Sequence, residues 1–146
     1  MAQFRKGIYT PQNPEKYVGR RQAIYRSSFE YKFMRFLDIS PSILQWSSES
    51  ISITYTHPLT GRPTRYFPDF LIKIKDKDGN ECVEIIEIKP FKQTFPPVVT
   101  KGKRKATILT EAKTWAINTA KWTAAREFCL NRGFTFRILT EKDLFN

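Results

Sequence analysis

Residues 65–90 contain three side chains whose types and spacing could carry out chemistry: Asp69, Glu87 and Lys89. Glu87 and Lys89 end a segment that is otherwise largely apolar, where an acid and a base are unusual. Because side chains alternate between the two faces of a strand, Glu87 and Lys89 share one face and the neighbouring isoleucines share the other. Two carboxylates, one from each of two strands, can hold a divalent cation through oxygen ligands. A lysine beside them can orient or activate a water molecule, or stabilise a phosphate.

The composition is that of a globular protein. The chain has 146 residues, of which 40% are hydrophobic and 14% aromatic, enough for one domain with a core. We therefore expect residues 1–146 to form a single domain. No apolar run approaches the roughly 20 residues that span a bilayer, and the N-terminal residues are polar, without the apolar core of a signal peptide. These features predict an intracellular protein with no membrane partner.

The charge balance favours a polyanionic partner. Lys and Arg total 25 against 14 acidic residues, giving a net charge of +11. Nucleic acid is the commonest partner of such a chain, although simple solubility is an alternative. Cys82 and Cys129 lack the spacing of a zinc site or a disulfide framework, so we expect reduced core thiols. With His57 as its single histidine, the chain offers little for a histidine-rich metal site or a Ser-His-Asp triad.

A helix is predicted over residues 26–38. Ser27 or Ser28 can cap its start, and Glu30 falls in the first turn, where a carboxylate interacts favourably with the helix dipole. Glu30 can therefore be explained by capping alone, or by a part in the site. The apolar positions recur at helical spacing and are Phe29, Phe33, Phe36 and Leu37.

Three strands should follow and place the candidate residues. The pattern predicts strands over residues 43–56, 64–75 and 81–89, the first with clean alternation only after Glu49. A Pro- and Gly-containing turn joins the first two, and an Asp-Gly hairpin joins the last two. The three strands should form an antiparallel meander, which brings Asp69 and Glu87 to one end of a sheet.

The remainder of the chain should flank this sheet. Residues 106–132 show helical spacing, with Gly133 as the C-terminal cap, and residues 134–139 should form a fourth strand, paired in parallel through the crossover helix. The apolar-face positions of the helix over residues 106–132 are Ile108, Ala112, Trp115, Thr119, Trp122, Arg126 and Cys129.

Residues 1–20 should form a basic, irregular arm.

Residues 91–105 should form a polar loop with a basic run. The cationic residues are Lys101, Lys103, Arg104 and Lys105. Such a run is either a solvated connector or a phosphate-contacting loop, because phosphate contacts come from Lys and Arg clusters. The sequence favours neither interpretation over the other.

As a set, the order of a Glu-bearing helix, a strand with Pro-Asp, a strand with Glu-x-Lys, a helix and a strand resembles the PD-(D/E)xK nuclease superfamily. The resemblance implies an α/β fold with a restriction-endonuclease-like core. This core is a mixed sheet of about four strands, an antiparallel meander plus one strand added after a crossover helix, flanked by helices. The alternative is that Asp69 caps or pairs locally and that Glu87 and Lys89 form only a salt bridge.

A closer resemblance, to the head completion nucleases of T4-like tailed phages and more loosely to the TnsA endonucleases of Tn7-type transposons, covers nearly the whole chain. The matching blocks are residues 25–30, 45–49, 65–69, 86–90, 114–118, 121–122 and 136–141. The family pattern does not explain the basic, Pro-rich segment at residues 95–105. The resemblance implies cleavage of double-stranded DNA with Mg²⁺, or Mn²⁺ as a substitute. It also implies a place in the virion and the host cytoplasm, with portal or head-completion proteins as candidate partners.

The resemblance also implies roles for individual residues. It assigns Glu30, Asp69, Glu87 and Lys89 to the active site and the three acids, with the backbone carbonyl of Ile88, to the metal. Three further residues are candidates for DNA contacts, in addition to the four basic residues of the loop, which are candidates through their charge and not through the resemblance. The three further residues are Arg26, Asn118 and Lys121.

Three rival functions stay open. One is a virion structural protein at the head vertex, which binds DNA ends or the portal with little or no cleavage and would need the same charge. Another is a TnsA-like transposon endonuclease, which we expect to need a partner-binding C-terminal domain; the few residues after Leu139 leave little room for one. A binding module without chemistry would leave the shared face of Glu87 and Lys89 unexplained.

Overall fold

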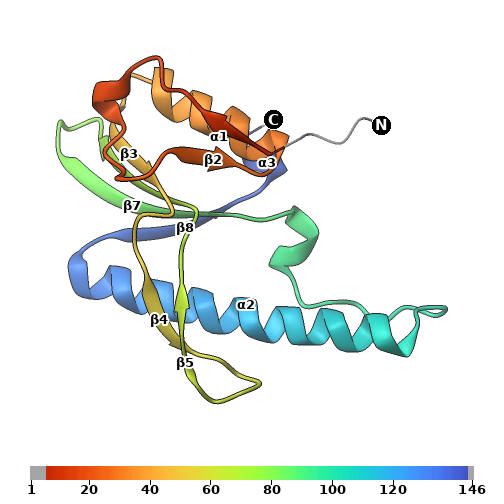
Figure 1. Ribbon diagram of the computed structural model, residues 1–146. Helices are drawn as coiled ribbons and strands as arrows, with labels where there is room; N and C mark the ends of the chain where they lie inside the picture. The colour runs from red at the N-terminus through yellow and green to blue at the C-terminus, as the bar shows by residue number, and fades with distance from the viewer. Residues whose placement is uncertain (1–5, 145–146) are drawn as a thin grey trace.

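The computed structural model describes residues 6–144 and is built in layers around a mixed sheet (Figure 1). The sheet has the strand order β3-β6-β7-β8, with β7 and β8 parallel and the other neighbours antiparallel. Its strands are β3 (Ile43–Ser48), β6 (Phe70–Lys75), β7 (Glu81–Ile88) and β8 (Thr135–Leu139). The expected α/β core, a meander plus a parallel strand added after a helix, is confirmed.

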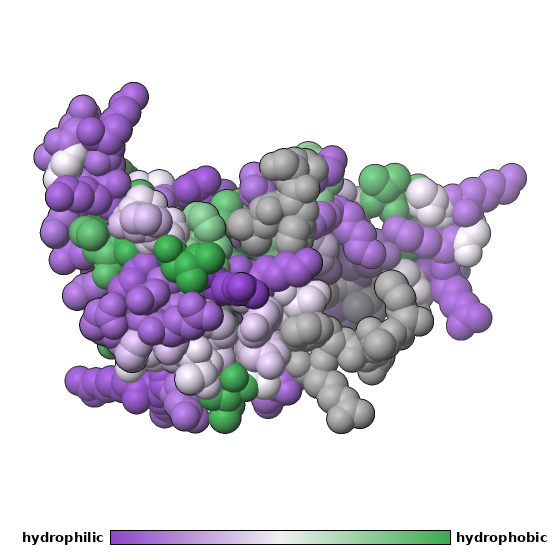
Figure 2. All heavy atoms as spheres, turned by 90° about the horizontal axis from the view of Figure 1, so that it is seen from above, coloured by the Kyte–Doolittle hydropathy of each residue, from purple (hydrophilic) through white to green (hydrophobic). Residues whose placement is uncertain are grey.

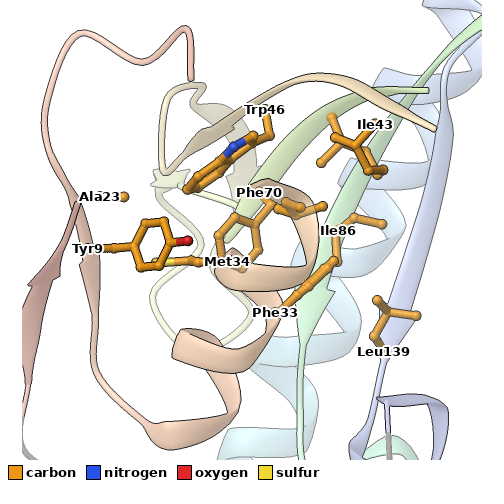
Figure 3. Packing of buried hydrophobic residues seen from close by; sticks show 11 residues of the cluster. Tyr9, Ala23, Phe33, Met34, Ile43, Trp46, Phe70, Ile86 and Leu139 are labelled. Atoms are coloured by element: carbon orange, nitrogen blue, oxygen red, sulfur yellow. The ribbon is translucent and has the colours of Figure 1, made fainter. Parts of the chain in front are cut away.

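Helices cover both faces of this sheet. Helix α1 (Ser28–Ile39) lies on one face, and helix α2 (Lys105–Arg132) crosses the other (Figure 1). Neighbouring residues of β7 show the alternation. Ile86 packs under α1 with Phe33 and Phe70 (Figure 3), whereas Ile85 packs against α2 with Cys129. Glu87 comes next after Ile86, so alternation places it on the α2 face.

Helix α1 begins at a capping box. The Ser27 hydroxyl accepts a hydrogen bond from the backbone N–H of Glu30 (3.1 Å), and the Glu30 carboxylate accepts one from the N–H of Arg26 (3.2 Å). Of the two serines proposed as caps, Ser27 is therefore the one used. The predicted apolar stripe is wrong at Phe36, which is 48% exposed, because the sheet lies nearer to Phe33 and Met34 on the adjacent edge of the helix.

The two long strands predicted over residues 43–56 and 64–75 are each broken. The first stops at Ser48, and Glu49 then takes a positive φ of 50°. The second stops before Pro68, which has no N–H to give to a ladder. The pieces beyond the breaks, β4 (Ile53–Thr56) and β5 (Pro63–Tyr66), pair as a separate ribbon that packs against α2. The breaks leave Asp69 just outside the end of β6.

The described part of the N-terminal arm is not irregular, as was expected for residues 1–20. Strand β1 (Gly7–Tyr9) pairs with β2 (Ala23–Tyr25), and a 3-10 turn, η1 (Pro14–Lys16), lies between them. The arm is held by Asp38 at the end of α1. This fully buried carboxylate accepts hydrogen bonds from the Tyr9 hydroxyl (2.6 Å) and from backbone N–H groups of the arm. A buried charge with several donors is the reason that the arm folds back.

Helix α2 is longer than the surface it covers. Gly133 caps its end at φ 71°, as predicted, but the predicted stripe is only partly right, because Ala112 and Arg126 are exposed. The buried positions all lie from the middle of the helix onwards and are Asn118, Trp122, Ala125 and Cys129. The first half extends past the edge of the sheet and meets the segment that follows β7, which includes η2 (Phe91–Thr94) (Figure 1). The last described element is the short helix α3 (Glu141–Leu144).

The outer surface of the α1 layer is mainly hydrophilic, with separate apolar patches (Figure 2). Among the described helices, none is long and apolar enough to cross a membrane.

Replacing Asp38 by Asn should destabilise the fold by about 2 kcal/mol at neutral pH, since an amide cannot serve the same set of donors. Burial raises the pKa of Asp38, but hydrogen bonds from Tyr9, Gln12 and Asn13 outweigh it and lower the pKa overall. The contribution is therefore complete above the unfolded pKa of about 3.9 and is lost as the pH falls through the lower folded pKa.

Urea unfolding of the parent and Asp38→Asn at a series of pH values measures this difference. The matched control is Asp78→Asn in the exposed turn after β6, which should change little at any pH. A gap between parent and Asp38→Asn that stays constant down to strongly acidic pH would contradict the role given to the carboxylate.

Candidate active site

Asp69 and Glu87 face each other at the end of the sheet where β6 begins and β7 ends. Phe70 pairs with Ile86 in the ladder, so the next pair outward is Asp69 with Glu87. The Oδ2 atom of Asp69 accepts a hydrogen bond of 2.7 Å from the backbone N–H of Ile88. Glu87 is only 6% exposed. The structure thus brings together the two carboxylates that the sequence placed on neighbouring strands.

Lys89 lies on the same side as Glu87, as alternation predicted. Its Nζ atom is 3.8 Å from the Glu87 Oε2 atom, and 27% of its side chain is exposed. Its backbone N–H donates to the carbonyl of Leu139 (3.0 Å), which keeps it in line with β8. The ion pair is too long for a hydrogen bond. The ammonium group therefore stands near the acids while keeping contact with solvent.

Lys121 and Tyr66 lie beside Glu87, and the sequence predicted only the first of them as a site residue. Lys121 was a candidate for DNA contact. Its Nζ lies 5.6 Å from the ring centroid of Tyr66 and 5.9 Å from that of Tyr55, and its charge acts on Glu87 to lower the pKa of that carboxyl. Tyr66 is 3% exposed, and burial together with the neighbouring Glu87 charge raises the pKa of its hydroxyl. Tyr66 was missed, and its one signal is its place just before Phe67-Pro68-Asp69.

Glu30 serves as a cap and also lies near the acids. Burial, and then the charge of Asp69, raise the pKa of Glu30, whereas its bonds to Arg26 and Ser27 act in the opposite direction. Within residues 6–144, no three His, Cys, Asp or Glu side chains are grouped closely enough to hold one metal ion. Glu30 therefore does not join Asp69 and Glu87 as a direct third ligand in this arrangement, and a water molecule would have to bridge it.

The two facing acids are costly to hold in the charged form. Burial, and then the charge of Glu87, raise the pKa of Asp69. Burial also raises the pKa of Glu87, against the opposing effect of Lys89. Mg²⁺ is commonly held by one or two carboxylates with water and phosphate oxygens as the other ligands. The donor set of two carboxylates beside the Ile88 backbone fits such an ion.

Arg26 and Glu49 form an ion pair next to the acids. The guanidinium group makes a two-point contact with the Glu49 carboxylate, and the backbone N–H of Glu49 donates to the carbonyl of Asp69 (3.0 Å). Arg26 thus lies at the site, as its assignment to DNA required, but it is partnered in this structure. Glu49 was missed as a site residue because its position depends on the left-handed backbone at the end of β3.

The basic loop does not line the acidic site. Helix α2 starts at Lys105, and Asn118 lies 13 residues further along (118 − 105), or about 20 Å at 1.5 Å per residue. Within the loop, Lys103 donates to the Val98 carbonyl (2.7 Å) and to Glu111 (2.9 Å), so it holds the loop to α2. The exposed cations left to meet a ligand are Lys101, Arg104 and Lys105.

Opposed Asp and Glu carboxylates with a lysine on the same face, at one end of a mixed sheet, are the features of a PD-(D/E)xK nuclease core. Residues 40–141 match the family model described as TnsA-like endonuclease N terminal, and the chain belongs to this family. It is also similar to the head completion nuclease of Enterobacteria phage T4, with 42% identity over 144 residues, covering 94% of this chain and 92% of that protein. Both resemblances expected from the sequence are confirmed.

Neutralising one acid should stabilise the metal-free protein. Because the fold raises the pKa of Glu87, it disfavours the charged form, and Glu87→Gln should raise the free energy of unfolding by about 1 kcal/mol. Thermal melting in EDTA measures this. The control is Glu84→Gln, since Glu84 is equally buried on β7 but is paired with Arg137 at 3.4 Å. A gain for Glu84→Gln and a loss for Glu87→Gln would contradict the electrostatics described.

Proposed function

We propose that this protein is a metal-dependent endonuclease that hydrolyses phosphodiester bonds of double-stranded DNA. Asp69 and Glu87 would hold Mg²⁺, or Mn²⁺ in its place, with the backbone carbonyl of Ile88 as a further ligand and Glu30 acting through water. The observation that carries this proposal is the opposition of Asp69 and Glu87 with Lys89 on the same face. Membership of an endonuclease family supports the reaction class.

Different residues of the chain would have different roles in the reaction. A bound ion supplies Lewis acidity toward the scissile phosphate and toward the attacking water. The N–H of Ile88 holds one oxygen of Asp69 and so orients the carboxylate. Lys89 would position the water or offset negative charge that develops on the phosphate. Lys121 would add positive charge on the α2 side of Glu87, where its charge already acts.

DNA would be held mainly through its backbone. A net charge of +11 favours contact with phosphates regardless of sequence. We propose that Asn118 and Lys121 of α2 would contact the strand near the acids, with Arg26 on the other side of the site. The basic loop, about 20 Å along α2, would contact phosphates about six base pairs away.

The relative in phage T4 supports a biological setting. That protein is named a head completion nuclease. We infer that this chain also acts in head completion and DNA packaging of a tailed phage, in the virion and the host cytoplasm. Portal or head-completion proteins are its candidate partners.

Plasmid nicking in Mg²⁺ tests the reaction. Asp69→Asn, Glu87→Gln and Lys89→Met should each slow nicking at least 100-fold, because each removes a ligand or a transition-state charge, and EDTA should stop the parent. The matched control is Lys73→Met, since Lys73 is paired with Glu81 towards the other end of β7 (3.2 Å) and should cut normally. Parent-like cleavage by Asp69→Asn and Lys89→Met would refute the assignment.

Neutralising the basic loop should weaken DNA binding without changing sequence preference. The triple variant Lys101→Ala, Arg104→Ala, Lys105→Ala should lower the slope of log K against log salt concentration by up to about 3. Fluorescence anisotropy with two unrelated duplexes at several salt concentrations measures this. The control with equal charge change is Lys75→Ala, Lys77→Ala, Arg132→Ala, from exposed positions elsewhere. An equal drop in both variants would show that the loop is only a solvated connector.

A virion structural role without cleavage is the second candidate. It is favoured by the Glu87–Lys89 ion pair, which partly neutralises the site without any metal. Virions assembled with the Glu87→Ala chain decide between the two. If their infectivity equals that of the parent, structure is the function and cleavage is incidental.

A further inference from the structure

A cleft of about 790 Å³ lies between the segment that follows β7 and the first half of α2, and the mechanism above makes no use of it. Its volume falls in the range of about 300–1,000 Å³ that is usual for small-molecule pockets. Aromatic rings from both sides line it: Phe91 and Phe95 from the segment, and Trp115 from the helix. Figure 1 shows this segment looping out beyond the sheet to reach the start of α2.

The walls of the cleft are held in place by contacts at both ends. Phe91 and Phe95 pack edge to face with centroids 4.9 Å apart. The backbone N–H of Phe91 donates to the Glu141 carboxylate (3.0 Å), and the Lys142 Nζ atom lies 3.5 Å from the Phe91 ring centroid. The bridge from Lys103 to Glu111 closes the other end (2.9 Å). The aromatic surface is therefore preorganised, which lowers the entropic cost of binding a ligand.

Asn118 supplies a polar group at the wall of the cleft. It lines the cleft and is only 6% exposed as a residue. Within residues 6–144 its side-chain amide has no hydrogen-bond partner, yet it is not among the fully buried unpaired polar atoms, so it remains open to the cleft. An open amide of this kind can donate a hydrogen bond to a ligand and accept one from it.

The cleft adjoins the acidic site. Asn118 lies three residues before Lys121 on α2, so the two share a face of the helix, and the charge of Lys121 acts on Glu87. Phe91 follows Lys89 by two residues. A DNA strand with a phosphate at the acids could therefore place a neighbouring base in the cleft.

We propose that this cleft binds an unpaired nucleobase of the strand that is cut, and this proposal rests on the proposed nuclease function. The aromatic rings would pack against the base, as in single-strand binding proteins, and the Asn118 amide would hydrogen-bond to the base edge. The preferred substrate would then be DNA with a single-stranded extension or flap next to the cut, rather than fully paired DNA.

The charge around the cleft favours nucleic acid over an apolar peptide. The loop that leads into α2 carries Lys101, Arg104 and Lys105, all exposed, and such cations match a phosphate backbone. Phe95 is 50% exposed and so is accessible to a base without rearrangement of the core.

Binding without cleavage tests the proposal. Anisotropy in EDTA compares three labelled hairpin DNAs: one fully paired, one with a short unpaired thymidine extension, and one whose extension consists of abasic sites. The parent should bind the thymidine extension about tenfold more tightly than the other two, the order expected for one base–aromatic stack. Phe95→Ala should lose this preference and keep the affinity for paired DNA, and Asn118→Ala should also lose the preference.

Phe36→Ala is the matched control, because Phe36 is a similarly exposed aromatic on α1 (48%), and it should retain the preference. If Asn118→Ala is too unstable to be measured, Phe95→Ala alone still tests the proposal. Equal affinity of the parent for all three DNAs would overturn the proposal, and so would an equal loss by Phe95→Ala on paired and extended DNA. Unchanged DNA binding by both cleft variants would also overturn it and point to a protein ligand. Plasmid nicking in Mg²⁺ is measured separately. The result of the binding experiment therefore does not decide whether the protein is a nuclease.

Discussion

The hydrogen bond from the Ile88 N–H to the Asp69 carboxylate is the contact on which the site depends. Pro68 ends the regular ladder. Beyond it, the Asp69 side chain replaces the backbone as the partner of the neighbouring strand. The bond ties the strand ends together and holds Asp69 opposite Glu87. A single interaction therefore completes the sheet and orients the acids, because the carboxylate replaces a backbone acceptor at the point where the strand breaks.

Gathering acids at this point carries an electrostatic cost that the surrounding cations only partly offset. Asp69 and Glu87 are desolvated and repel each other, while Lys89 and Lys121 act against that repulsion from two sides. An arrangement that disfavours its own charges is common where function has been selected over stability. In the proposed function, a dication and a phosphate together would balance the charges that the protein alone balances only in part.

Much of the fold could be predicted from local patterns. The hairpin after β6, the Gly133 cap and the alternation that places Glu87 with Lys89 each depend on a few adjacent residues, so the sequence alone indicates them. Tyr66 and Glu49 were not predicted as site residues because their positions depend on breaks in the two long strands. A positive φ at a glutamate has no reliable sequence signal, and Pro68 marks a break without showing where the chain goes next.

By itself, the sequence determined the mixed sheet, the basic charge and the identities of the principal acids and lysine, because strand alternation and composition are local properties. Only the tertiary structure decided which of these groups meet. It directed Lys103 to Glu111, gave Arg26 a partner and turned Asn118 toward an aromatic cleft. Such outcomes depend on how far α2 extends past the sheet and on which loop packs against it, and these are set by packing between segments distant in the chain.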